Sequence, residues 1–220
     1  MVPGNTRPAS EDHTETHCLR RTKQGVLWYL GDAGQMARYR LRYQALRLRF
    51  ITAYEGKCEC CGEDNQRLLT IDHMGGGGRD TGHSAYAKAI KAGHSSGKYR
   101  LLCWNCNMAI GNFGYCPHDG QRKKSPANWT TENRWQLRVE RVTAYGGKCR
   151  ICGESRIEFL CIDHINGGGS QHRRSFNNNN DKFYRWLESQ GYPRDEYQLL
   201  CSNCNALKEM YVRESQSASR

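Results

Sequence analysis

The sequence predicts an α+β protein built from two small, zinc-stabilised units in tandem. Three observations carry this prediction: an internal repeat, four C-x-x-C pairs, and a composition that supplies too little apolar material for one large core. Only 37% of the 220 residues are hydrophobic. Two compact units, each held by a metal ion, suit such a composition better than a single large core does.

The repeat is clearest in two pairs of segments. LLCWNCN at 101–107 recurs as LLCSNCN at 199–205, and TAYEGKC at 52–58 recurs as TAYGGKC at 143–149. The first pair is offset by 98 residues (199 − 101) and the second by 91 (143 − 52). The second copy therefore has seven additional residues (98 − 91), and the polar run Asn177–Asn180 predicts a surface loop there.

The repeat also suggests how the chain is divided. We expect a flexible N-terminal segment at 1–37, a first unit at 38–118, a linker at 119–129, a second unit at 130–212 and a flexible tail at 213–220.

A basic helix should lead into each unit, and a short strand should follow each leading C-x-x-C pair. The segments at 38–54 and 133–145 place apolar side chains near helical spacing between arginines. RLLTIDH at 67–73 and EFLCIDH at 158–164 are apolar runs that end in a polar pair, which indicates strands. The second C-x-x-C of each unit should open a helix. The arginines either form a solvated basic face or contact DNA, and the sequence leaves both open.

Eight of the twelve cysteines form C-x-x-C pairs, two pairs in each unit. Four thiolates make a closed tetrahedral Zn²⁺ site, so this pattern favours structural zinc over a redox role. The first set is Cys58, Cys61, Cys103 and Cys106, and the second is Cys149, Cys152, Cys201 and Cys204. We expect ordinary reduced thiols at the remaining Cys18, Cys60, Cys116 and Cys161, with a metal contact from Cys116 and His118 as the alternative.

The charge balance indicates a polyanionic partner. Lysine and arginine exceed aspartate and glutamate by 33 − 22 = 11, which suits nucleic acid or an anionic membrane surface. No apolar run approaches the roughly 20 residues of a membrane span. The first residues lack the basic and apolar regions of a secretory signal, so we expect a cytoplasmic protein whose cysteines bind metal rather than form disulfides.

Each unit places Asp-His after an apolar strand, between its two cysteine pairs, and an Asn directly after its fourth cysteine. This ordered set, found at 52–110 and again at 143–208, resembles the HNH or ββα-metal (His-Me finger) endonucleases. It is most similar to the branch of recombination endonuclease VII, in which two C-x-x-C pairs hold zinc. The resemblance implies two treble-clef-like ββα-metal units.

The resemblance also implies roles for the shared residues. Asp72 and Asn107 would bind a catalytic Mg²⁺ in the first unit, as would Asp163 and Asn205 in the second. His73 and His164 would act as general bases, because histidine titrates near neutral pH. The zinc ions would have only a structural role.

Other features carry weaker predictions. His83, His172 and Arg173 follow the glycine runs and are candidates for phosphate contact. The two histidines either contact phosphate, lie near the metal or are simply exposed. The glycine runs at 75–78 and 167–169 either let backbone approach a phosphate or form turns. The aromatic residues of FYRWL at 183–187 are expected to lie in the core.

These predictions lead to three hypotheses about function. The first is a Mg²⁺-dependent DNA endonuclease, of phage or mobile-element origin, that cuts double-stranded or branched DNA with two active sites in one chain. It would act either as a monomer that resembles a dimer or as a true dimer. The second is a non-catalytic zinc-stabilised protein that binds nucleic acid. The third combines one active unit with one unit that docks on DNA.

Overall fold

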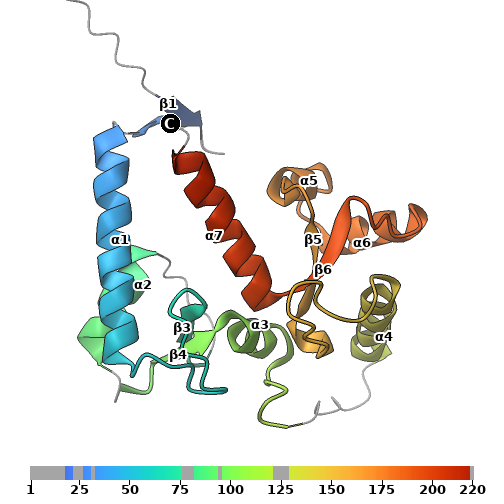
Figure 1. Ribbon diagram of the computed structural model, residues 1–220, viewed down its shortest axis with the longest axis horizontal. Helices are drawn as coiled ribbons and strands as arrows, with labels where there is room; N and C mark the ends of the chain where they lie inside the picture. The colour runs from blue at the N-terminus through green and yellow to red at the C-terminus, as the bar shows by residue number, and fades with distance from the viewer. Residues whose placement is uncertain are drawn as a thin grey trace, which may run out of the picture. The chain divides into compact units, whose positions relative to one another are not determined.

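The computed structural model describes residues 18–21, 27–30, 33–75, 82–93, 96–120 and 129–218. The chain divides after Leu46 into two compact units. Residues 1–46 contain the antiparallel hairpin of β1 (Cys18–Arg21) and β2 (Leu27–Leu30) and the beginning of α1 (Ala33–Ala53). Residues 47–220 contain both copies of the repeat (Figure 1). Of the segment expected to be flexible, 1–37, residues 1–17, 22–26 and 31–32 lie outside the described residues.

The first copy is a hairpin followed by a helix. Strand β3 (Leu69–His73) pairs antiparallel with β4 (Tyr99–Cys103), and α2 (His83–Ala92) lies between them in the sequence. Helix α3 (Trp104–Phe113) begins directly after β4, so the second C-x-x-C pair does open a helix as predicted.

The second copy repeats this order with additions. Helix α4 (Trp129–Ala144) leads to the 3-10 turn η2 (Ile157–Phe159) and β5 (Leu160–His164). Strand β6 (Tyr197–Cys201) pairs antiparallel with β5 and continues into α7 (Ser202–Ala218). The seven-residue insertion contributes to α5 (Gly169–Ser175) and to the turn before α6 (Asn180–Ser189).

The two hairpins have the same register, which confirms an α+β architecture with two small antiparallel hairpins. In both, the histidine of the Asp-His pair lies opposite a tyrosine: His73 opposite Tyr99, and His164 opposite Tyr197. In both, the strand that carries Asp-His begins opposite the first cysteine of the second C-x-x-C pair.

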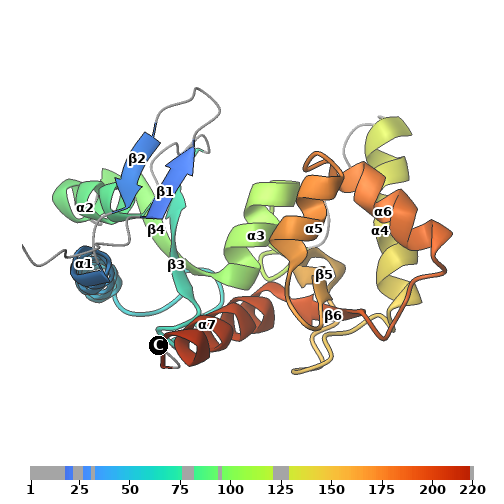
Figure 2. The same cartoon turned by 90° about the horizontal axis from the view of Figure 1, so that it is seen from above.

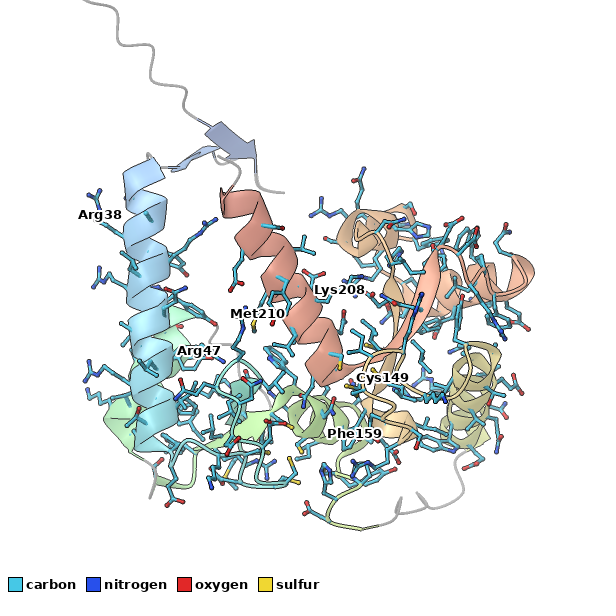
Figure 3. The ribbon with its side chains drawn as sticks, viewed as in Figure 1. Arg38, Arg47, Cys149, Phe159, Lys208 and Met210 are labelled. Carbon is cyan, nitrogen blue, oxygen red and sulfur yellow. The ribbon has the colours of Figure 1, made fainter. Side chains whose placement is uncertain are left out.

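An arginine of each leading helix fastens that helix to its hairpin. Arg47 donates to the carbonyl oxygens of Gln66 and Leu69, the latter at 2.7 Å. Arg138, 91 residues further on, donates to the carbonyl oxygen of Leu160 at 2.5 Å and to that of Ile157. Figure 3 labels Arg47 beside the C-terminal half of α1. At least one arginine of each basic helix therefore has a structural role.

Each copy packs its own apolar residues. Phe50, Tyr54 and Leu101 are fully buried in the first copy. The second copy has a cluster of Phe183, Leu187 and Tyr197, against which Trp186 and other aromatic side chains pack. The prediction that the aromatic residues of FYRWL lie in the core is confirmed for Phe183, and Tyr184 and Trp186 are half-buried against it.

The two copies meet at the beginnings of α3 and α7 (Figure 2). The backbone N–H of Asn105 donates to Oδ1 of Asn203 at 2.9 Å, and the N–H of Asn203 donates to Oδ1 of Asn105 at the same distance. Arg67 forms an ion pair with Glu214, and the hydroxyl of Tyr115 donates to Glu158. These contacts all lie within the compact unit of residues 47–220.

Several boundaries differ from those expected. Helix α1 begins at Ala33, and α7 continues to Ala218 instead of ending near 212, because no proline or glycine interrupts its sequence.

The run Asn177–Asn180 is a tight turn, in which Asn177 and Asn178 have positive φ and Asn179 caps α6. Most of the expected linker, 121–128, lies outside the described residues. Among the described helices none is long and apolar enough to span a membrane.

Candidate functional site

Both predicted sets of four cysteines come together in space. In each set the sulfur atoms lie within 4.8 Å of one another. The Cys61 and Cys103 sulfurs are 3.8 Å apart, and the Cys152 and Cys201 sulfurs are 3.7 Å apart. A Zn–S bond of about 2.3 Å places the sulfurs of a tetrahedral site about 3.8 Å apart. The two clusters therefore suit two structural zinc ions.

The sequence forms the same knuckle before each hairpin. The N–H of Cys58 donates to the carbonyl of Glu63, and the N–H of Cys149 donates to that of Glu154, both at 2.8 Å. The glycine after each pair has a positive φ, which a residue with a side chain rarely adopts. Each knuckle thus holds two thiols beside the strand-to-helix corner that supplies the other two.

The Asp-His pairs end the first strand of each hairpin, where the opposite strand contacts the carboxylate. Asp72 lies opposite Arg100, whose Nε donates to Oδ2 of Asp72 at 2.7 Å. Asp163 lies opposite Gln198, whose amide donates to Oδ2 of Asp163 at 2.8 Å.

A lysine from α7 adds a positive charge to the second carboxylate. Nζ of Lys208 lies 2.5 Å from Oδ2 of Asp163 and 2.5 Å from the carbonyl oxygen of His164. Figure 3 shows Lys208 on the side of α7 that faces the second hairpin. Both carboxylates are therefore neutralised by basic side chains of the chain itself.

The two histidines have different surroundings. Nε2 of His73 is buried and has no hydrogen-bond partner, and its ring meets that of Tyr99 edge-on at 5.2 Å. Nε2 of His164 lies 3.0 Å from Nδ1 of His172, which also lies 3.0 Å from the Tyr197 hydroxyl. The second site is thus a connected histidine–tyrosine cluster.

Electrostatics favour the neutral form of His164. Burial is the main cause that lowers the pKa of this imidazole, and the positive charges of His172, Arg173 and Lys208 lower it further, against the charge of Asp163. A histidine that stays neutral at pH 7 can accept a proton.

The glycine run of the second copy brings backbone close to this histidine. A Cβ at Gly169 would lie 2.8 Å from Nδ1 of His164, a distance that a real side chain could not keep. Gly167 and Gly168 form the turn before it with positive φ. The run therefore accommodates the imidazole and lets α5 deliver His172. Gly76–Gly78 lie outside the described residues.

Each predicted asparagine contacts the strand that carries its Asp-His pair. The amide of Asn107 donates to the carbonyl of Ile71 at 3.2 Å, and the amide of Asn205 lies 3.5 Å from the sulfur of Cys161. Oδ1 of Asn205 is buried without a hydrogen-bond partner. In both copies, therefore, the asparagine of the helix contacts the strand that ends in the Asp-His pair.

The residues predicted to contact phosphate lie on two different helices, α2 and α5. His172 belongs to the second site, and Arg173 is exposed beside it on α5. His83 begins α2. Sequence reasoning missed Arg100 and Lys208. The repeat offered a signal for Lys208, because its equivalent in the first copy, at an offset of 98, is the apolar Ile110.

Comparison with models of protein families, with curated proteins and with solved structures found no match to this chain.

Proposed function

We propose that residues 47–218 form a Mg²⁺-dependent DNA endonuclease with two catalytic centres. The observation that carries this proposal is the same in both repeats. Beside a tetra-cysteine cluster, an asparagine of the helix contacts the strand that ends in Asp-His. Each centre also keeps a buried polar atom without a hydrogen-bond partner, Nε2 of His73 in the first and Oδ1 of Asn205 in the second. A buried polar atom without a partner is costly unless a ligand or the reaction uses it.

The donor set suits a hard divalent cation. Carboxylate and amide oxygens are the ligands that Mg²⁺ accepts from proteins. Asp72 and Asn107 would hold the ion in the first centre, and Asp163 and Asn205 in the second. Arg100 and Lys208 already pair with these carboxylates, at 2.7 Å and 2.5 Å, so a bound cation would share each carboxylate with a basic side chain. When bound, Mg²⁺ supplies a positive charge for the scissile phosphate and for the departing oxygen.

The remaining chemistry belongs to the histidines. His73 and His164 would accept the proton of the attacking water. The burial that lowers the pKa of His164 keeps it available as a base. In the second centre, His172 and Tyr197 would hold that imidazole in place. The excess of eleven positive charges supports a polyanionic substrate.

A second candidate is supported by the difference between the centres. Within the part of the chain that the structure describes, Lys208, His172 and α5 lie beside the second centre and have no counterpart beside the first. In this alternative the first centre cuts and the second docks on DNA.

The test is cleavage of supercoiled plasmid with Mg²⁺ and with EDTA. The proposal predicts that wild-type protein linearises plasmid, that His73→Ala and His164→Ala each only nick it, and that the double variant leaves it intact. His94→Ala, outside both motifs, is the matched histidine control. If only one substitution matters, the docking alternative holds. If plasmid, branched and single-stranded DNA all stay uncut while zinc and DNA are bound, the chain is a binding protein.

A further inference from the structure

A second group of metal-ligating side chains adjoins the first zinc cluster. The sulfurs of Cys60, Cys106 and Cys116 and a ring nitrogen of His118 lie within 4.8 Å of one another. Nδ1 of His118 lies 3.3 Å from the sulfur of Cys106, 3.4 Å from that of Cys116 and 3.9 Å from that of Cys60. In a tetrahedral zinc site, sulfur and nitrogen ligands stand about 3.6 Å apart.

The distinctive residue is Cys106, because it belongs to both groups. Its sulfur is 3.5 Å from that of Cys103 in the first cluster, and it also contacts His118 in the second. Seven residues therefore offer eight coordination positions if Cys106 serves twice, and two tetrahedral ions need eight.

We propose that the first repeat holds a binuclear zinc cluster. Cys58, Cys61 and Cys103 bind one ion, Cys60, Cys116 and His118 bind the other, and the thiolate of Cys106 bridges them. The chain would then hold three zinc ions instead of two.

The charges favour this arrangement. Six thiolates and two Zn²⁺ ions leave a net charge of 4 − 6 = −2. One zinc ion with four thiolates leaves 2 − 4 = −2, so the second ion adds no net charge to a partly buried site. Thiolate and imidazole are also the ligands that zinc prefers.

The second repeat provides an internal comparison. Ile151 stands at the position of Cys60 and is 64% exposed. At an offset of 98, Glu214 and Gln216 replace Cys116 and His118. The second repeat therefore keeps a single tetra-cysteine cluster, and the additional ligands belong to the first repeat alone.

The position of the second ion suggests its role. It would fasten the turn after α3 to the first knuckle, since Cys116 and His118 follow that helix and Cys60 lies in the knuckle. The ring of His118 also lies 5.1 Å from that of Phe159 in η2. The ion would thus brace the end of the first repeat against the second. In the metal-free site the thiol of Cys60 contacts both carboxylate oxygens of Asp119 at 3.7 Å, and this thiol proton would leave when Cys60 binds zinc.

The first measurement is the zinc content of the full chain, purified under reducing conditions with zinc. We expect three ions in the wild type, two in Cys60→Ser and in His118→Ala, and three in the control Cys18→Ser, which alters a cysteine in the other compact unit. Two ions in the wild type, or three in both Cys60→Ser and His118→Ala, would overturn the proposal.

The second measurement uses the wild type alone, so it does not depend on whether a variant folds. After substitution with ¹¹³Cd, a bridging thiolate should couple two of the three cadmium resonances to each other and leave the third a singlet. Three singlets would refute the bridge.

Discussion

Replacing Asn105 by alanine should weaken the junction between the two repeats. The carbonyl oxygen of its side chain accepts the N–H of Asn203, which belongs to the first turn of α7. The first N–H groups of a helix have no partner within it, and losing a side chain that caps one costs about 1 kcal/mol. Asn105 is only 8% exposed, so water would not readily replace it. For a unit of this size, that loss lowers the melting temperature by about 2–4 °C.

The assay is thermal and urea unfolding followed by circular dichroism, in buffer with zinc and reductant. Asn203→Ala should cost as much as Asn105→Ala, because the two contacts have the same length. Asn105→Asp is the matched control, since it keeps an acceptor oxygen and adds a negative charge that the start of a helix favours. The reasoning is wrong if Asn105→Asp is as destabilising as Asn105→Ala, or if neither changes the unfolding midpoint.

Three further predictions concern the second repeat and zinc. Lys208→Met should lower the Mg²⁺ concentration that gives half-maximal cleavage in a His73→Ala background, because its ammonium group no longer competes for Asp163; an unchanged or higher requirement would contradict this. In the same background, cleavage should stay constant as the pH falls from 7 and should decline only below pH 6.5, the ordinary pKa of histidine. The reason is that His164 has a lowered pKa and must be neutral to act. A midpoint above pH 6.5 in the pH–rate profile would argue against His164 as the base. Cys149→Ser should release one zinc ion and lower the melting temperature, whereas equal metal content and stability would contradict a structural second site.

The features of this protein that sequence predicts best are those set by short-range spacing. The two cysteines of a C-x-x-C pair lie close enough to bind the same metal ion. An Asp-His pair that follows an apolar run lies at the end of a strand. The repeat then doubles each observation, so one consistent alignment predicts both hairpins and both tetra-cysteine clusters.

Contacts that depend on the length and packing of helices could not be predicted in this way. Lys208 reaches Asp163 because α7 runs back along the hairpin, and His172 reaches His164 because the insertion forms a helix. The sequence predicted ordinary thiols at Cys60 and Cys116 because the two cysteines are 56 positions apart (116 − 60). The turn after α3 brings Cys116 back beside Cys60.

The paired contact of Asn105 and Asn203 has the form of an isologous interface. The two residues hold equivalent positions in the two repeats. The backbone N–H of each donates to the side-chain oxygen of the other, as happens across the two-fold axis of a dimer of identical subunits. The chain therefore has the organisation of a homodimer whose subunits became fused end to end. Fusion makes their association independent of protein concentration. It also lets each copy change alone: a homodimer would have to carry the added thiols and helix α5 in both subunits or in neither.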